Sequence, residues 1–177
     1  MKLICIRHTS VAVPKGICYG QSDVGLAESY PVERMKISNQ LPEHSIDRIF
    51  CSPLSRCQTL AKDLFPEYEI VLDDRLKELN FGQWEMQTWD SISQTEEAKA
   101  WFNDFVAVTC PGGESFNDQI NRTADFLDEL KQLNFTSVVV VAHGGILRSI
   151  HCLIKGTTPL DAFKSKVDYG EIVLFDL

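Results

Sequence analysis

Five short apolar runs along the chain predict β-strands. They cover residues 3–6, 47–51, 69–72, 137–142 and 171–175. Runs of this length, rich in β-branched side chains and bounded by polar or turn residues, are typical of strands buried in a sheet. The fourth run contains four consecutive valines, Val138 to Val141, which predicts a central parallel strand buried on both faces.

Between these runs, the helical spacing of apolar residues predicts four helices, over residues 31–41, 53–64, 115–133 and 146–154. Ser52 is expected to cap the second helix, with Pro53 in its first position. Ser115 and Asp118 have the spacing of a capping box at the start of the third. Because strands alternate with helices, the pattern predicts an α/β fold, a three-layer α/β/α sandwich around a mainly parallel sheet.

The segment of residues 84–112 differs in character from the rest of the chain. It contains all three tryptophans, together with Phe102 and Phe105, among polar and acidic residues. This composition predicts one or two short helices inserted between core elements as a small helical cap. Residues 1–177 are therefore expected to form a single domain, a length sufficient to bury a core of its own.

Composition and charge narrow the class of protein. The hydrophobic content of 44% and charged content of 24% are ordinary for a soluble globular protein. The net charge of −8 argues against a nucleic-acid or anionic-membrane partner, and no apolar run approaches the length that spans a bilayer. The six cysteines form no C-x-x-C pair, which predicts reduced, mostly buried thiols in a cytoplasmic protein. The oligomeric state stays open between monomer and homodimer.

Chemically versatile residues follow three of the predicted strands. Arg7 and His8 come directly after the first strand, Arg56 lies in the first turn of the helix after the second, and His143 and Gly144 follow the valine-rich strand. Since ligands of parallel α/β sheets bind beyond the carboxyl ends of the strands, these side chains are expected to converge. Arginines, imidazoles and helix N-termini together suit a dianionic phosphoryl group. Glycine after the histidine lets the backbone approach a ligand closely.

A metal site is the alternative use of the same residues. His8 and His143 could bind zinc with a carboxylate, but two arginines in the pocket would repel a cation. We therefore expect no metal and no cofactor. Two plainer roles stay open, Arg56 as a surface residue and His143 as a hydrogen-bonded core histidine. His44, in a polar loop, and His151, within a helix, are expected to be structural.

Four motifs occur in order along nearly the whole chain. In them the sequence resembles the histidine phosphatase superfamily, with its phosphoglycerate-mutase-like fold: Arg7-His8-Thr9, residues 51–59 around Arg56, residues 78–85 from Glu78 onward, and Ala142-His143-Gly144-Gly145. The resemblance implies that His8 is the nucleophile that becomes phosphorylated. It implies that three residues bind the phosphoryl oxygens: Arg7, Arg56 and His143. The family's common first motif is Arg-His-Gly, so Thr9 is a departure that leaves the nucleophile intact.

The resemblance also implies that Glu78 is the proton donor, although Glu85 and Glu114 could compete with it. His8 has to attack as a neutral imidazole. One ring nitrogen must then be free, and the other is expected to be held by a hydrogen bond to a backbone carbonyl.

Residues 16–23, Thr9 before them and residues 110–115 resemble the α-ribazole phosphatase branch of this superfamily. That branch removes the 5′-phosphate during assembly of the lower nucleotide loop of cobalamin. Within the first stretch, Gln21 and Ser22 could contact the substrate phosphate or form a plain turn. The cap tryptophans would suit a flat, benzimidazole-like base, although each could equally belong to the core.

The expected partner is thus a small-molecule phosphate monoester, and the expected reaction is its hydrolysis. A broad-specificity or sugar-phosphate phosphatase would share the same catalytic residues. A phosphoglycerate mutase would need a bisphosphate pocket with further basic groups, and a phosphohistidine-protein phosphatase would need an open surface. A non-catalytic phosphate-binding module is the alternative from a different class, and the intact set of five family residues argues against it.

Overall fold

The protein forms a five-stranded sheet within the residues that the computed structural model describes, 1–41 and 45–177. The predicted role of His44 lies outside these residues. The strand order is β3-β2-β4-β1-β5. Neighbouring strands are parallel except at the edge, where β5 is antiparallel to β1. The strands are β1 (Lys2–Arg7), β2 (Arg48–Cys51), β3 (Ile70–Leu72), β4 (Ser137–Ala142) and β5 (Ile172–Asp176).

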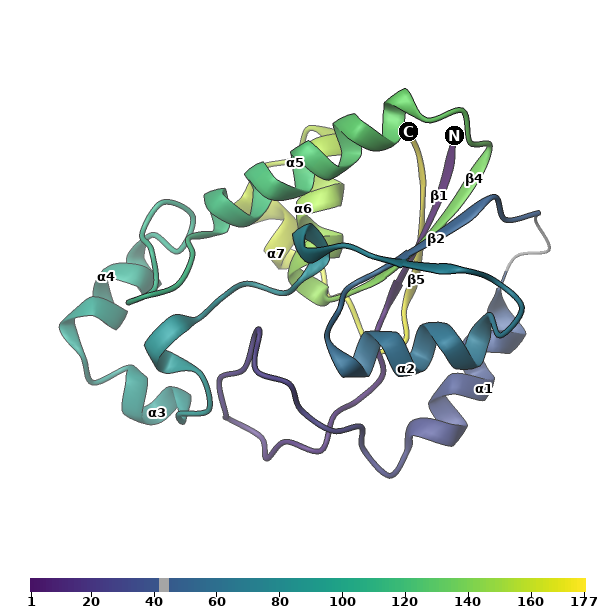
Figure 1. Ribbon diagram of the computed structural model, residues 1–177. Helices are drawn as coiled ribbons and strands as arrows, with labels where there is room; N and C mark the ends of the chain where they lie inside the picture. Colours follow the sequence, from purple (N-terminus) through teal and green to yellow (C-terminus); the bar gives the residue numbers. More distant parts are fainter. Residues whose placement is uncertain (42–44) are drawn as a thin grey trace.

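Helices cover both faces of this sheet, which confirms the three-layer α/β/α sandwich (Figure 1). Two lie on one face: α1 (Tyr30–Gln40) and α2 (Ser55–Leu64). Three lie on the other: α5 (Phe116–Gln132), α6 (Gly144–Lys155) and α7 (Pro159–Lys164). Two short helices extend away from the sheet: α3 (Trp89–Ile92) and α4 (Glu96–Asn103).

The two faces of the sheet have separate apolar cores. Along β4, Val138 and Val140 pack with α5 and α6, whereas Val139 and Val141 pack with α2. Successive side chains of a strand point to opposite faces, so an unbroken valine run fills both cores at once. Every residue of β4 is buried, as the sequence pattern predicts for a central strand.

Most predicted elements are confirmed, and the start of α2 is corrected. Ser52 is not the cap of this helix, which begins at Ser55 after Leu54. Ser52 instead lies in the turn after β2, where its hydroxyl is 2.7 Å from Nε2 of His143. The capping box at Ser115 is confirmed. The short helix α7 was not predicted from the sequence.

Residues 84–112 contain α3, α4 and a small cluster of their own. Trp84, Ile92, Ala98 and Cys110 pack there with Cys18, away from the two sheet cores. Backbone hydrogen bonds join this segment to the loop after β1: the residue 18 amide donates to the residue 87 carbonyl, and the residue 89 amide to the residue 16 carbonyl, both at 2.8 Å. The segment is thus attached to the loop that follows the Arg-His pair.

All six cysteines are buried and free. Burial raises the pKa of Cys51 to about 12, so this thiol stays protonated and unreactive at neutral pH. No helix within the described residues is long and apolar enough to cross a membrane.

Candidate active site

The carboxyl ends of β1 and β4 bring the predicted residues together. The residue 8 amide donates to the residue 142 carbonyl at 3.0 Å, because the parallel pairing of the two strands continues one step beyond their ends. The rings of His8 and His143 therefore lie 5.1 Å apart, centre to centre. Arg56 reaches them from the first turn of α2, and its Nε lies 3.3 Å from Nε2 of His8.

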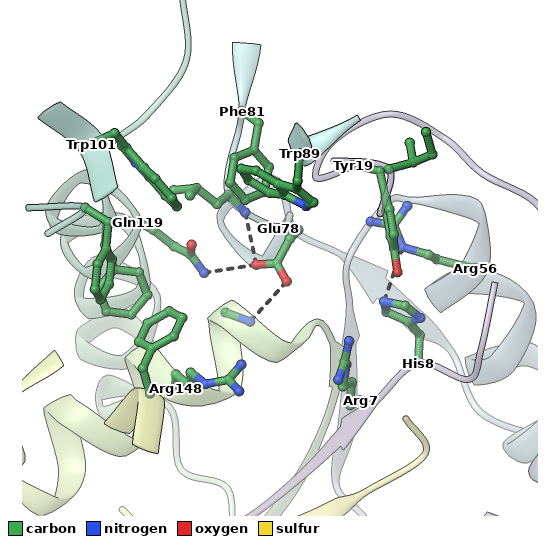
Figure 2. Close-up of a pocket in the computed structure, with 16 residues that line it drawn as sticks. Arg7, His8, Tyr19, Arg56, Glu78, Phe81, Trp89, Trp101, Gln119 and Arg148 are labelled. Carbon is green, nitrogen blue, oxygen red and sulfur yellow. Dashed lines mark hydrogen bonds between the residues drawn. The ribbon is translucent and has the colours of Figure 1, made fainter. Parts of the chain in front are cut away.

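His8 and Arg56 border a cavity of about 340 Å³, whereas His143 and Gly144 lie next to it and are not among the residues that line it. Figure 2 shows His8, Arg7 and Arg56 at one end of it and the aromatic residues Phe81, Trp89 and Trp101 at the other. The polar side chains that line it are Arg7, His8, Tyr19, Arg56, Glu78, Gln119 and Arg148. Its aromatic walls are Phe81, Trp89, Trp101, Phe105, Phe116 and Phe163. The cavity is therefore cationic at one end and apolar at the other.

One hydrogen bond sets the state of the His8 ring. Its Nδ1 is 2.7 Å from the Thr9 carbonyl, an acceptor, so Nδ1 carries the proton and Nε2 keeps its lone pair. Burial lowers the pKa of His8 to about 3, Arg56 and Arg7 add to this shift, and the bond to Thr9 opposes it. His8 is therefore neutral at physiological pH, with Nε2 unprotonated and accepting a hydrogen bond from Arg56 Nε.

Arg56 is fully buried and does not lie on the surface of its helix. Its Nη1 and Nη2 donate to the carbonyls of Ser22 and Gly20 at 3.0 and 2.6 Å. Its guanidinium lies 5.5 Å from the ring centre of Tyr19. These contacts hold Nε toward His8 and offset the cost of burying the charge.

Arg7 lies between a tyrosine and the start of α6. Its guanidinium is 4.0 Å from the ring centre of Tyr169, and its Nη1 donates to the Val167 carbonyl. A Cβ at Gly144 would come within 3.3 Å of the Arg7 guanidinium and 3.2 Å of Arg148 Nη1. Gly144 therefore lets two arginines pack against the N-terminus of this helix.

His143 is fully buried beside His8. Its Nε2 is 2.7 Å from the Ser52 hydroxyl and 3.5 Å from Sγ of Cys57. Burial lowers the pKa of His143 well below its usual value, and repulsion by His8 in its protonated form and by Arg56 lowers it further. His143 is thus a neutral imidazole fixed in place by a serine.

Glu78 enters the cavity from the segment after β3. Its Oε2 accepts from the Gly145 amide at 3.0 Å, and its Oε1 from the Leu79 amide at 3.0 Å and from Nε2 of Gln119 at 3.3 Å. A Cβ at Gly145 would lie 2.2 Å from Oε1. The glycine after Gly144 thus leaves the space that this carboxylate occupies.

The two competing carboxylates have structural contacts elsewhere. Glu85 accepts from the Gln21 and Ser22 amides at 2.8 and 2.6 Å. Burial alone would raise the pKa of Glu85, but hydrogen bonds from Ser22 and from the backbone of Gln21 bring it below its usual value. Glu114 forms an ion pair with Arg122 at 2.8 Å. Glu78 is the one of the three that lines the cavity.

Gln21 and Ser22 are not among the residues that line the cavity. Their amides bind Glu85, the Ser22 carbonyl accepts from Arg56, and Nε2 of Gln21 donates to the Glu78 carbonyl. Contact of either residue with substrate phosphate stays a prediction.

Three polar residues of the cavity were missed from the sequence: Tyr19, Gln119 and Arg148. Arg148 lies four residues after Gly144 in α6, and Gln119 lies four residues after Ser115 at the start of α5. Residues at this spacing share one face of a helix, so periodicity could have indicated both. Tyr19 carries no comparable signal, because it lies in an irregular loop.

Within residues 1–41 and 45–177, no group of three or more His, Cys, Asp or Glu side chains could hold a metal ion. His151 lies near Phe175, with ring centres 6.1 Å apart, and is not among the residues that line the cavity. The site is therefore built from imidazoles, guanidinium groups and one carboxylate, a set suited to a phosphoryl group.

An α/β/α sandwich with two histidines and two arginines near the carboxyl ends of its central strands has the fold and the site of a phosphate-binding protein. Comparison with known families places the chain within that class. It belongs to the histidine phosphatase superfamily (branch 1), whose sequence model matches residues 3–177. The phosphoglycerate-mutase-like fold implied by the motifs is confirmed by solved structures.

Individual relatives carry different phosphatase names. The chain is 28% identical to Phosphoserine phosphatase 1 of Hydrogenobacter thermophilus over 88% of its own length and 77% of that protein. It is similar to an Escherichia coli structure described provisionally as an alpha-ribazole-5′-P phosphatase, with a TM-score of 0.90, 25% identity and coverage of 98% and 89%. It is also similar to the structure of the alpha-ribazole phosphatase of Shigella flexneri, with a TM-score of 0.92 and 24% identity. The match covers 100% of this chain and 91% of that one. The family and these relatives support a phosphatase.

Proposed function

We propose that this protein hydrolyses phosphate monoesters through a phosphohistidine formed on His8. The observation that carries the proposal is the state of that ring: Nδ1 donates to the Thr9 carbonyl, and the unprotonated Nε2 accepts a hydrogen bond from Arg56 Nε. A neutral imidazole with its lone pair directed to a cationic pocket is a nucleophile for phosphorus. Arg7, Arg56 and His143 bind the phosphoryl oxygens, with Gly144 leaving room for the backbone of α6 to approach.

The reaction has two displacements. Nε2 of His8 forms a bond to phosphorus while the ester P–O bond breaks, and Glu78 gives its proton to the departing oxygen. A water molecule then attacks phosphohistidine, Glu78 takes a proton from it, and the N–P bond breaks. The products are the alcohol and inorganic phosphate, and His8 and Glu78 return to their starting states. Guanidinium and N–H groups that stabilise the negative charge on the phosphoryl oxygens supply most of the acceleration.

We propose α-ribazole 5′-phosphate, in cobalamin nucleotide-loop assembly, as the substrate. The aromatic end of the cavity supports a flat leaving group, since aromatic walls favour stacking on a π system. The Escherichia coli structure with 25% identity bears the corresponding name. The phosphoserine phosphatase among the relatives supports the second candidate, a histidine phosphatase of broader or different specificity.

Residues 1–177 are proposed to act as one domain, with residues 84–112 as a cap over the leaving group. The link between that segment and the loop after β1 supports this role. A cytoplasmic location, inferred from the cysteines, and a metal-independent reaction belong to the same proposal.

Trapping of the phosphoenzyme tests the mechanism. Wild-type protein incubated with a ³²P-labelled phosphate ester and quenched is expected to carry acid-labile label on an imidazole nitrogen. His8→Ala is expected to carry none and to lose turnover, whereas His151→Ala, a histidine outside the cavity, retains both. EDTA is expected to leave turnover unchanged. Near-normal turnover of His8→Ala would exclude the proposal.

A substrate panel tests the specificity. It compares kcat/KM for α-ribazole 5′-phosphate, phosphoserine, 3-phosphoglycerate and sugar phosphates under one set of conditions. α-Ribazole 5′-phosphate is expected to have the highest kcat/KM. A higher kcat/KM for another ester would make that ester the proposed substrate and would leave the phosphohistidine mechanism unchanged.

A further inference from the structure

The middle of the cavity contains a buried hydrogen-bond acceptor without a partner. Gln119 is fully buried and lines the cavity, and its Oε1 has no hydrogen-bond partner within the described part of the chain. Its Nε2 donates to Oε1 of Glu78 at 3.3 Å. In this arrangement Nε2 is the donor to Glu78, so the amide oxygen Oε1 is the atom left without a partner. Because buried acceptors are rarely left unpaired, a ligand donor is the natural partner.

Gln119 lies between the cationic and aromatic ends of the cavity. Its amide contacts Glu78, the residue proposed to protonate the ester oxygen, and Figure 2 shows it between Glu78 and Trp101. A Cβ at Gly145 would come within 3.1 Å of Gln119 Oε1, so the amide also packs against the start of α6. A donor that pairs with Oε1 therefore belongs to the part of the leaving group closest to the ester bond.

Arg148 offers an unpaired donor to the same cavity. Its Nε is buried and has no partner within the described residues. Its Nη2 makes a long contact of 3.4 Å with the Ser165 carbonyl, and its guanidinium lies 4.7 Å from the ring centre of Phe163. The start of α5 thus supplies an acceptor to the cavity, and α6 supplies donors.

A hydroxyl group can both donate and accept, so it suits both residues. We infer that the leaving group carries hydroxyls close to the ester oxygen, as in a sugar or another polyol, and that Gln119 recognises them together with Arg148. This inference rests on the proposed function, because it takes the ester oxygen to lie beside Glu78. It assigns a specificity role to two residues outside the four family motifs.

An amino-acid leaving group is the competing reading. Its ammonium could donate to Gln119 and its carboxylate could bind Arg148. The walls beyond these residues are Phe81, Trp89 and Trp101, which a small zwitterion would leave unfilled. Burying a zwitterion against apolar rings carries a larger desolvation cost than burying hydroxyls that are attached to a flat apolar group.

A matched ligand pair tests the inference. The ligands are the non-hydrolysable 5′-methylene phosphonate analogues of adenosine and 2′,3′-dideoxyadenosine, which differ only in two hydroxyls. Calorimetry gives Kd for each ligand with wild type, Gln119→Met and Arg148→Met. Gln132→Met, the same change at an exposed position of the same helix, is the control. Any effect on Glu78 or on the total charge is common to both ligands and cancels in the ratio of their Kd values.

Wild type is expected to bind the hydroxylated ligand about tenfold more tightly, the effect of one or two neutral hydrogen bonds. This ratio is expected to fall to near one in Gln119→Met, to shrink in Arg148→Met and to stay at the wild-type value in Gln132→Met. Equal affinities in wild type, or a preference that survives in Gln119→Met, would overturn the inference. Tighter binding of the methylene phosphonate analogue of phosphoserine than of both nucleoside ligands, lost in Arg148→Met, would establish an amino-acid leaving group in its place.

These outcomes separate the inference from the proposed function. A phosphoenzyme on His8 together with equal affinities removes the hydroxyl recognition and leaves the hydrolysis. A hydroxyl preference without a phosphoenzyme keeps the recognition and removes the phosphohistidine mechanism.

Discussion

At the scale of single residues, one carbonyl oxygen decides how His8 can react. The Thr9 carbonyl takes the proton of Nδ1 as its hydrogen-bond partner, which leaves Nε2 as the nucleophile. The backbone of residue 9 makes this bond, so the departure from the family's glycine does not remove it. Glu78 is positioned in a similar way, because N–H groups donate to both of its carboxylate oxygens.

Glu78→Gln tests the proton-donor role at this scale. The amide keeps the size of the side chain but cannot deliver a proton to the ester oxygen. We expect kcat/KM, which reports only the steps up to release of the alcohol, to fall about 10²- to 10⁴-fold for an alkyl phosphate. The loss of kcat/KM should be much smaller for p-nitrophenyl phosphate, whose leaving group needs no proton. Equal losses on the two esters, measured by steady-state kinetics, would show that Glu78 acts on structure or binding instead.

At the scale of elements, the start of α6 organises the site more than any other segment. Its first two residues are glycines, and each makes room for a different group: Gly144 for the Arg7 guanidinium and Gly145 for the Glu78 carboxylate. The Gly145 amide also donates to Glu78, so this helix N-terminus positions the proton donor through a backbone group.

Gly145→Ala tests the spacing at this helix start. The new Cβ would lie 2.2 Å from Glu78 Oε1 and 2.7 Å from Gln119 Nε2, so the carboxylate has to move. We expect kcat to fall about tenfold or more, since small misplacements of catalytic groups are costly. Gly25→Ala is the matched control, because a Cβ there meets nothing within 4 Å and it should retain wild-type kcat. Unchanged kcat in Gly145→Ala would contradict the assigned geometry.

At the scale of the whole molecule, an acidic protein contains a cationic cavity. The net charge is −8, yet Arg7, Arg56 and Arg148 line one cavity with a single carboxylate, Glu78. Local charge inside a low-dielectric cleft outweighs screened surface charge, so the acidic surface does not prevent phosphate binding. Burial at the same site keeps both histidines neutral, so the free energy of unfolding depends on pH.

Acid stability tests this pH dependence. The folded pKa of His8 is about 3 and that of His143 is also lowered, against about 6.5 in an unfolded chain. Between these values the unfolded chain binds more protons, so the free energy of unfolding falls as pH decreases from about 6.5 toward 3. The slope is up to about 1.4 kcal/mol per pH unit for each histidine.

Urea unfolding at a series of pH values measures this slope. His8→Asn is expected to show a shallower dependence than wild type between about pH 6 and 4, because one buried histidine no longer has to stay neutral. Identical slopes for the two proteins would contradict the lowered pKa of His8.

Local sequence was enough to locate the strands, the capping box at Ser115 and the convergence of Arg7, His8, Arg56 and His143. The strands and helices follow from the different spacing of apolar residues in each. The convergence follows because the carboxyl ends of parallel strands lie on the same side of the sheet. Ser52 shows where such reasoning fails. A serine before a proline is a good local helix cap, but the Ser52 hydroxyl instead forms a hydrogen bond with His143, 91 residues away in sequence.

The sequence alone thus determined the sandwich, the cationic end of the site and the phosphatase family, because those depend on short-range patterns and on side chains set at strand ends. Only the tertiary structure decided which nitrogen of His8 is free, that Glu78 and not Glu85 or Glu114 faces the cavity, and that Tyr19, Gln119 and Arg148 join it. Those features depend on loops and helix faces that meet across long stretches of chain, and no local pattern encodes the distance between them.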